Sequence, residues 1–459
     1  MASSGSDFYN GGRRSPWWAV AISMVGTSIS GVTFISVPGM VRASLFSYMQ
    51  MALGFFFGYI FIACVLLPIY YKRNLLSIYG YLEERFGRFS YKTGAVFFLL
   101  SKYLGCGVRM YLTAIVLQLL LFDGLGIPFA VNVALTMLVV WAYTIKGGVK
   151  TLVWTDMVQT LAMLGAVVLC IIFIGKELGL DVRGMAVAIR NSEMSRTWFF
   201  DDPLGRRWFF KQFLAGAFTT IAMTGLDQDM MQKNLSCPSL KDSRKDMLCY
   251  GFSFIPVNFL FLCLGALLYI YAGSVRYVPA RPDDLFPTLA VHYLPTAVGV
   301  VFVIGLLCAA FSSAGSALTS LTSTVTLDLF GVGRDAVAEK KNIRLRRLVH
   351  SANALVMTGV ILLFQLIGNG SVIDAVYTVA SYTYGPLLGL FLFGLFTNRK
   401  AADRLSPIIC ILSPVICLVL STHSREWLGG YEMGFEVLLY NAAITFLALL
   451  LTSRKRRSC

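Results

Sequence analysis

Hydroxyl side chains interrupt one long apolar stretch of the sequence, residues 296–327. Ser312, Ser316, Ser320 and Ser323 recur there at intervals of four and three residues, a spacing that places them on one face of a helix. Hydroxyl and carbonyl oxygens are hard, neutral ligands of the kind that a small hard cation prefers. The same hydroxyls could instead bond back to their own helix carbonyls or allow tight helix packing. The stripe by itself leaves both interpretations open.

A carboxylate lies inside a second apolar stretch, residues 150–175. Asp156 follows Lys150 by six residues, which is about 9 Å along a helix. An acid at that depth in apolar surroundings needs a cation or a basic side chain beside it. Asp156 is therefore a candidate ion ligand, with a structural ion pair as the alternative.

Two basic side chains, Lys102 and Arg109, lie within a third apolar stretch, residues 93–121. Arg109 could neutralise an anionic ligand, because an intramembrane guanidinium needs a counter-charge. A structural ion pair is the competing interpretation.

The first apolar stretch, residues 16–39, is weak as a helix near its middle. Glycines and hydroxyl residues cluster there: Gly26, Thr27, Ser28, Ser30, Gly31 and Thr33. Glycine and these polar residues are poor helix formers, so we expect a broken helix with free backbone carbonyls. A small-residue packing face is the alternative.

The composition determines which elements carry these residues. The chain has 459 residues, of which 57% are hydrophobic and 14% charged, whereas soluble domains have about 25% charged residues. A membrane-spanning helix needs about 20 apolar residues, and twelve stretches approach or exceed that length. They lie near residues 16–39, 44–71, 93–121, 127–145, 150–175, 208–231, 247–272, 296–327, 348–367, 371–397, 406–421 and 433–452. The sequence predicts an all-α integral membrane protein with twelve transmembrane helices.

Basic residues predict the orientation of these helices. Lys and Arg concentrate in alternate connections and in the tail at 454–457, which places those segments and both termini in the cytoplasm. The first stretch lies too close to the start, and is too polar in its middle, to be a cleaved signal peptide. The net charge of +15 thus belongs to the ends of apolar helices, and we expect no nucleic-acid partner.

Several classes of protein are excluded by what the sequence lacks. Its ten cysteines form no CxxC pair and lie mostly in apolar stretches, so they are neither a disulfide nor a metal framework. No GxxxxGK[ST] motif occurs and no soluble domain interrupts the helices. We therefore expect no enzyme and no organic cofactor, but a transporter or channel that a gradient drives.

Taken together, four segments resemble the sodium:solute symporter family, which includes carriers of glucose, proline, sialic acid and iodide. They are Trp17–Gly39, the motif Gly147-Gly148 with Trp154-Thr155-Asp156 and Gln159, the motif Gly225-Leu-Asp227-Gln228-Asp229 with Gln232-Lys233, and the hydroxyl-rich 296–327 stretch. Residues Tyr377–Pro386 are similar to a bacterial branch of the family.

The resemblance implies the leucine-transporter-type fold, with two five-helix inverted repeats and two C-terminal helices. The expected organisation is a cytoplasmic N-terminal segment (1–15), a first repeat (16–175), an extracellular loop (176–207), a second repeat (208–397), two additional helices (398–453) and a basic cytoplasmic tail (454–459). Family members usually begin with an extra helix, whereas this chain begins about 15 residues before its first core helix. It is either truncated or lacks that helix.

The resemblance also implies ligands for Na⁺ as the coupling ion. A first sodium would bind the backbone carbonyls of Gly26, Ile29 and Ala309 and the hydroxyls of Ser312 and Ser313. A possible second sodium would bind Asp156, Ser312 and Ser316; Gly315 stands where family members often have a further hydroxyl. Candidate residues for the solute are Ser28, Thr33, Gln50, Arg109, Phe218 and Tyr377.

The predicted function is sodium-coupled symport of a small organic solute, such as a sugar, sugar acid, amino acid or carboxylate, by alternating access. We expect a multi-pass protein of the plasma (inner) membrane whose partners are the solute and the lipid bilayer; a monomer would suffice, and the oligomeric state is open. The alternatives are a passive channel, a solute-sensing receptor and a proton-coupled carrier. A receptor would need a soluble signalling domain, which we do not expect here. A proton-coupled carrier would need a titratable group inside a span, but His292, His350 and His423 lie in loops or at the edge of a span.

Overall fold

The computed structural model describes residues 8–9, 11–75, 77–145, 148–332, 339–367 and 372–455. Gly147 of the predicted motif, most of the N-terminal segment before residue 8 and the tail after residue 455 lie outside these ranges.

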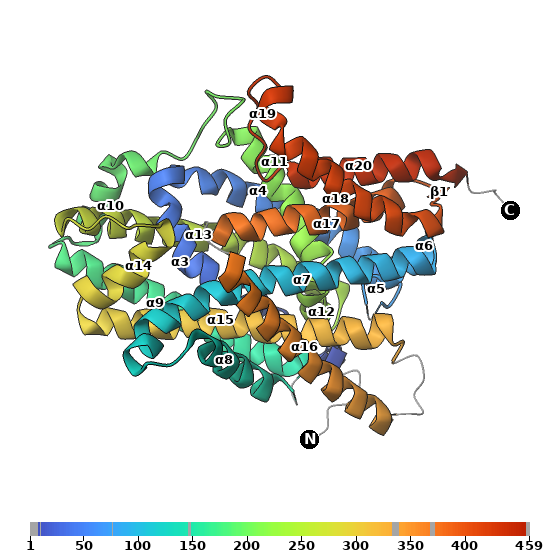
Figure 1. The fold of residues 1–459 in the computed structure, drawn as a ribbon, viewed down its shortest axis with the longest axis horizontal. Helices are drawn as coiled ribbons and strands as arrows, with labels where there is room; N and C mark the ends of the chain where they lie inside the picture. The colour runs from blue at the N-terminus through green and yellow to red at the C-terminus, as the bar shows by residue number, and fades with distance from the viewer. Residues whose placement is uncertain are drawn as a thin grey trace.

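The described chain is almost entirely helical (Figure 1). The helices are α2 Trp17–Ser28, α3 Gly31–Ser44, α4 Tyr48–Phe61, α5 Leu67–Lys72, α6 Gly80–Arg85, α7 Arg88–Leu117, α8 Phe129–Thr144, α9 Val149–Glu177, α10 Val182–Asn191, α11 Phe209–Thr220, α12 Gln228–Asn234, α13 Leu240–Ser274, α14 Leu285–Thr288, α15 Thr296–Thr324, α16 Glu339–Ile367, α17 Val372–Phe396, α18 Ser406–Thr422, α19 Ser424–Trp427 and α20 Val437–Thr452. Two short strands, β1 Arg399–Lys400 and β2 Arg454–Lys455, pair antiparallel beside the C-terminus.

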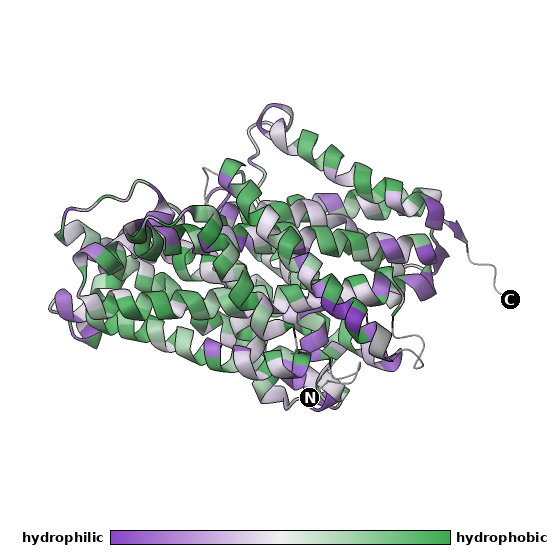
Figure 2. Ribbon diagram, turned by 60° about the horizontal axis from the view of Figure 1, so that its bottom comes forward, coloured by the Kyte–Doolittle hydropathy of each residue, from purple (hydrophilic) through white to green (hydrophobic). Residues whose placement is uncertain are grey.

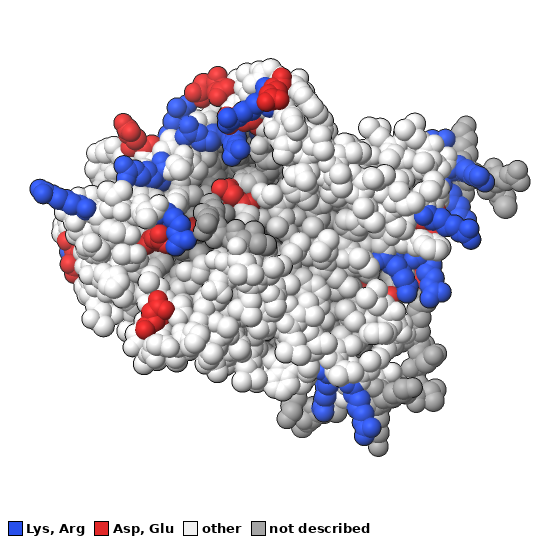
Figure 3. Space-filling view, viewed as in Figure 1, with Lys and Arg blue, Asp and Glu red and all other residues white. Residues whose placement is uncertain are grey.

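Hydrophobic residues follow the lengths of the long helices, and hydrophilic residues gather at the two ends of the molecule (Figure 2). Figure 3 shows the same division, with a band almost free of charge between two charged ends. Eight helical segments in the described ranges are long and apolar enough to cross a membrane; α8 and α20 are apolar but shorter. Helices occupy each of the twelve predicted stretches, and the number of spans stays a prediction.

The first predicted span is broken, as its composition led us to expect. Helix α2 ends at Ser28, Ile29 leaves the helical region with φ −83° and ψ 86°, and an extended Ser30 begins α3. Within the described residues, no main-chain N–H donates to the carbonyls of Gly26 or Ile29. The break therefore leaves strong acceptors without a main-chain donor inside the bundle.

A second break interrupts the sixth predicted span. Helix α11 continues into a π-helical turn, Ile221–Gly225, and the chain then becomes extended at Asp227. The carboxylate of Asp227 caps α12 by accepting from the N–H groups of Asp229 (2.8 Å) and Met230 (3.4 Å), an ordinary N-cap arrangement. Each half of the chain thus contributes one interrupted helix near the centre of the molecule.

Long helices surround these two breaks. Helix α15 packs against α9, α7 and α2, and α4 packs against α11; α7 and α15 run side by side along the long axis (Figure 1). Stripes of small residues let these backbones approach closely. This packing brings α2, α7, α9, α12 and α15, far apart in sequence, to one region.

Candidate functional site

A cavity lies between the two broken helices and their neighbours. Its walls come from α2 and α3, α4, α7, α11, α13, α15 and α17. Hydroxyl groups and aromatic rings make up much of the lining, and Lys102, Arg109 and Asp227 are its charged residues. A concave site with few polar groups among apolar side chains is typical of a small-molecule site.

Four of the six residues predicted to bind the solute line this cavity: Ser28, Thr33, Arg109 and Tyr377. The hydroxyl of Ser28 lies 2.5 Å from the phenol oxygen of Tyr250, and the phenols of Tyr377 and Tyr48 lie 2.7 Å apart. These hydrogen bonds connect α2 to α13 and α4 to α17, so they hold the cavity walls together.

The structure does not place Gln50 and Phe218 in the cavity. The fully buried amide of Gln50 donates to the carbonyl of Arg207 (2.9 Å) and accepts from the N–H of Phe199 (3.0 Å). Its hydrogen-bonding groups therefore hold the loop before α11. Phe218 packs on the hydrophobic core, while its neighbours Thr219 and Thr220 line the cavity, because successive helical residues point about 100° apart.

Arg109 lies in the cavity wall without an acidic partner. Among the described residues, no carboxylate forms an ion pair with its guanidinium, which is only partly buried. The phenols of Tyr48 and Tyr377 are its electrostatic neighbours. A guanidinium presents donors that match a carboxylate, so this wall can receive an anionic group.

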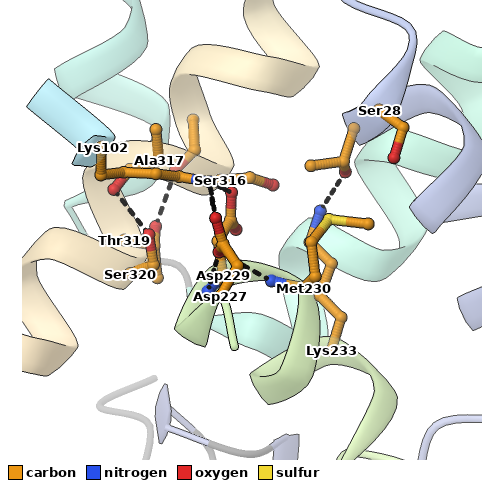
Figure 4. A network of polar contacts seen from close by, with 12 residues as sticks. Ser28, Lys102, Asp227, Asp229, Met230, Lys233, Ser316, Ala317, Thr319 and Ser320 are labelled. Carbon is orange, nitrogen blue, oxygen red and sulfur yellow. Dashed lines mark hydrogen bonds and ion pairs between the residues drawn. The ribbon is translucent and has the colours of Figure 1, made fainter. Parts of the chain in front are cut away.

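Lys102, two helical turns from Arg109 on α7, is fully engaged. Its ammonium lies 2.7 Å from Asp229 and 3.1 Å from Asp227. The phenol of Tyr384 donates to the same Oδ2 atom of Asp227 at 2.5 Å. Figure 4 shows Lys102 beside these two carboxylates, next to α15. This cluster connects α7, α12 and α17. It supplies Lys102 with carboxylate partners, whereas Arg109 has none among the described residues.

The residues predicted to hold a first sodium lie on α2 and on one face of α15. Ala309, Ser312 and Ser313 occupy positions i, i+3 and i+4 of α15, and Ser313 lines the cavity together with Thr27 and Ser28. The hydroxyl of Ser312 is buried and close to the carboxylate of Asp156, but it makes no hydrogen bond of good geometry in the described structure. A buried polar atom without a partner is costly, and such a hydroxyl, near carbonyls without a main-chain donor, suits a small cation.

The remaining hydroxyls of the α15 stripe have partners. Ser320 and Ser323 bond back to the carbonyls of Ala317 (2.9 Å) and Thr319 (3.0 Å). Ser316 donates to Asp156 at 3.0 Å. Ser320 and Ser323 therefore fit the alternative interpretation, in which a hydroxyl bonds to a carbonyl of its own helix.

Asp156 and Lys233 form an ion pair in which both side chains are completely buried. The ammonium of Lys233 also donates to the hydroxyl of Thr27. The carboxylate predicted for a second sodium therefore has a basic partner, the arrangement that the sequence left open as the alternative. Its Oδ1 atom makes no hydrogen bond in the described structure.

Sequence reasoning missed several residues of the site. The phenols of Tyr48, Tyr59 and Tyr250 line the cavity; Tyr59 donates to Tyr250, which also bonds to Ser28, and Tyr48 bonds to Tyr377. A tyrosine in an apolar helix is normally read as packing, so no sequence signal separated them from other aromatic residues. Lys233 ends the Gly225–Lys233 motif, and its spacing of four residues from Asp229 would have suggested that acid as its partner instead of Asp156. His350 is buried between Thr144 and Thr322, outside the cavity.

Comparisons with known proteins agree with this architecture. The model of the sodium:solute symporter family matches residues 8–403. The chain is 24% identical over 435 residues to the sodium/sialic acid symporter SiaT of Proteus mirabilis, covering 92% of this chain and 84% of that protein. It is 24% identical to the human sodium/iodide cotransporter, over 86% of this chain and 61% of that protein.

Among solved structures, the substrate-bound outward-open state of a Na⁺-coupled sialic acid symporter is similar with a TM-score of 0.80 at 20% identity, covering 99% of this chain and 94% of that one. A nucleobase-cation-symport-1 family transporter, Mhp1, is similar with a TM-score of 0.55 at 14% identity, covering 98% and 95%. The leucine-transporter-type fold is thereby confirmed. The chain belongs to the sodium:solute symporter family and is a sodium-coupled symporter that works by alternating access, not an enzyme.

Proposed function

We propose that the solute is a small organic acid whose carboxylate binds Arg109. The observation that carries this proposal is the guanidinium in the cavity wall without an acidic partner among the described residues. A cationic or neutral solute would leave the guanidinium without a direct ion-pair partner in a partly dehydrated cavity. Hydroxyls of Ser28, Thr33 and Tyr377 would receive the polar groups of the solute body. Relatives named for sialic acid and monocarboxylates support an acid.

We propose one coupling sodium at the break between α2 and α3, held by the carbonyls of Gly26, Ile29 and Ala309 and the hydroxyls of Ser312 and Ser313. Binding there would order the end of α2, whose residues Thr27 and Ser28 line the cavity. Sodium would in this way prepare the solute site. The second sodium site expected at Asp156, Ser312 and Ser316 is not part of this proposal, because Lys233 pairs with Asp156.

The orientation with both termini in the cytoplasm, in the plasma membrane, is supported by charge. In the view of Figure 3 the end near β2 shows mostly Lys and Arg, whereas the opposite end shows both signs. Cytoplasmic connections carry the excess of basic residues. Solute and sodium would then move inward, down the sodium gradient.

The test of the solute site is Arg109→Gln in proteoliposomes, with sialic acid, pyruvate and uncharged glucose as probes. We expect the wild type to take up at least one acid in a sodium-dependent manner. Arg109→Gln should reduce that uptake by about tenfold or more, because a charge-assisted pair contributes about 1.5–3 kcal/mol, while sodium still stabilises the protein against heat. Arg109→Lys should retain part of the activity. Wild-type uptake of glucose alone would contradict the proposal.

A further inference from the structure

The ammonium of Lys233 lies where four helices meet. Lys233 belongs to α12, its ion-pair partner Asp156 to α9, and Thr27, which accepts a hydrogen bond from the ammonium, to α2. Ser316 of α15 donates to the same Oδ2 atom of Asp156 at 3.0 Å. Lys233, Asp156 and Ser316 are completely buried. Figure 4 shows Lys233 on α12 below α2.

These contacts use one oxygen that a second sodium would need, Oδ2 of Asp156, while Oδ1 makes no hydrogen bond in the described structure. Asp156 and Ser316 are two of its three expected ligands, and the ammonium already occupies the carboxylate. A sodium ion and an ammonium beside one carboxylate would leave a positive charge buried without compensation. The nearest other acids on α12 and its cap, Asp227 and Asp229, are engaged by Lys102. Among the described residues, the charge of Asp156 is therefore compensated by Lys233.

We propose that Lys233 is a tethered cation that takes the place of a second sodium, so that the transporter couples one Na⁺ to each solute. This inference rests on the proposed sodium site at the break of α2. The ammonium stays with the protein throughout the cycle and carries no ion across the membrane. The ammonium also donates to Thr27, which lies in sequence between the proposed sodium ligands Gly26 and Ile29. Lys233 thereby links α12 to the end of α2.

The test is the number of radioactive sodium ions bound by the purified protein and the slope of that binding against sodium concentration. We expect the wild type to bind one ion with a Hill coefficient near one, and Asp156→Asn to change neither. Lys233→Met removes the charge and keeps an unbranched chain. It should bind a second ion and show a Hill coefficient approaching two, because the carboxylate of Asp156 is then without its positive partner. Lys233→Met combined with Asp156→Asn should return to one.

The outcomes separate this inference from the proposed function. Two sodium ions bound to the wild type would overturn the tethered-cation role and leave sodium symport intact. Loss of the single ion in Asp156→Asn would do the same, since it would place that ion on Asp156. Wild-type protein that binds no sodium would instead contradict the proposed function. If Lys233→Met is recovered only in sodium buffer and unfolds in choline buffer, the dependence itself supports a sodium ion at Asp156 in that variant.

Discussion

At the scale of single residues, the α15 hydroxyls illustrate how one pattern can serve several purposes. Ser312 is buried without a hydrogen bond, Ser316 bonds to Asp156, and Ser323 bonds to the carbonyl of Thr319. Their types and spacing are alike, but of these three only the Ser312 hydroxyl makes no hydrogen bond in the described structure, so it can turn its oxygen to an ion without breaking one. The proposed sodium site therefore depends on the first part of the stripe.

This difference makes a matched comparison possible within one helix. We expect Ser312→Ala to raise the sodium concentration required for half-maximal uptake by about tenfold, since one neutral oxygen ligand is lost while a buried unpartnered hydroxyl is removed at little cost in stability. Ser323→Ala should leave the sodium requirement unchanged. The measurement is sodium-dependent uptake at saturating solute, with expression and melting temperature as controls. An equal shift in both variants would speak against a sodium ligand at Ser312.

At the scale of elements, the cavity depends on how closely α4 and α11 approach. A β-carbon added at Gly54 would collide with the carbonyl of Phe213, and one added at Gly216 would collide with the carbonyl of Met51. The two backbones are thus in contact at both glycines. Helix α4 carries Tyr48, and α11 leads to Thr219 and Thr220, so the distance between these helices sets the width of one side of the site.

We predict that Gly54→Ala lowers the free energy of unfolding by about 1–3 kcal/mol, the usual cost of overpacking, and weakens solute binding. The control is Gly165→Ala on α9, where an added β-carbon meets no neighbouring atom. That change should be neutral or slightly stabilising, because alanine favours a helix by about 1 kcal/mol over glycine. Thermal unfolding of the purified variants in detergent measures both. A stable Gly54→Ala variant would show that α4 and α11 can separate without cost.

At the scale of the whole molecule, the charges around the cavity balance. Lys102, Arg109 and Lys233 carry three positive charges, and Asp156, Asp227 and Asp229 carry three negative ones. Lys102 and Lys233 are paired with these acids, so the solute and sodium sites add an anion at Arg109 and a cation at the break of α2. The loaded transporter would then have the same net charge as the empty one.

The balance predicts electroneutral transport for a monovalent acid. Moving one elementary charge across 100 mV changes the free energy by about 2.3 kcal/mol, but one Na⁺ with one monocarboxylate moves no net charge. Accumulation of that acid in proteoliposomes should follow the sodium gradient and be unchanged when a potassium diffusion potential is imposed. Lys233→Met, with a second sodium, should become dependent on the potential. A potential-dependent wild type would exclude one-to-one coupling to a monoanion.

The sequence by itself determined the features that depend on local composition. Apolar length specifies helices, the cluster from Gly26 to Thr33 weakens the first of them, and a spacing of four residues places hydroxyls on one face. Family membership followed because these motifs recur together, and the break, the fold and sodium coupling are confirmed. Each of these signals lies within one segment of chain.

Only the tertiary structure decided which polar groups have partners. Asp156 and Lys233 are 77 residues apart, and their pairing depends on the packing of α9 beside α12. Gln50 does not line the solute site, because its amide forms hydrogen bonds with the main chain of a loop about 150 residues later in the sequence. Lys102 has two acids because Asp227 and Asp229 lie beside it, whereas Arg109 forms no ion pair among the described residues. Polar side chains in an apolar interior are satisfied by whichever group packing brings near, and that neighbour is not written in the local sequence.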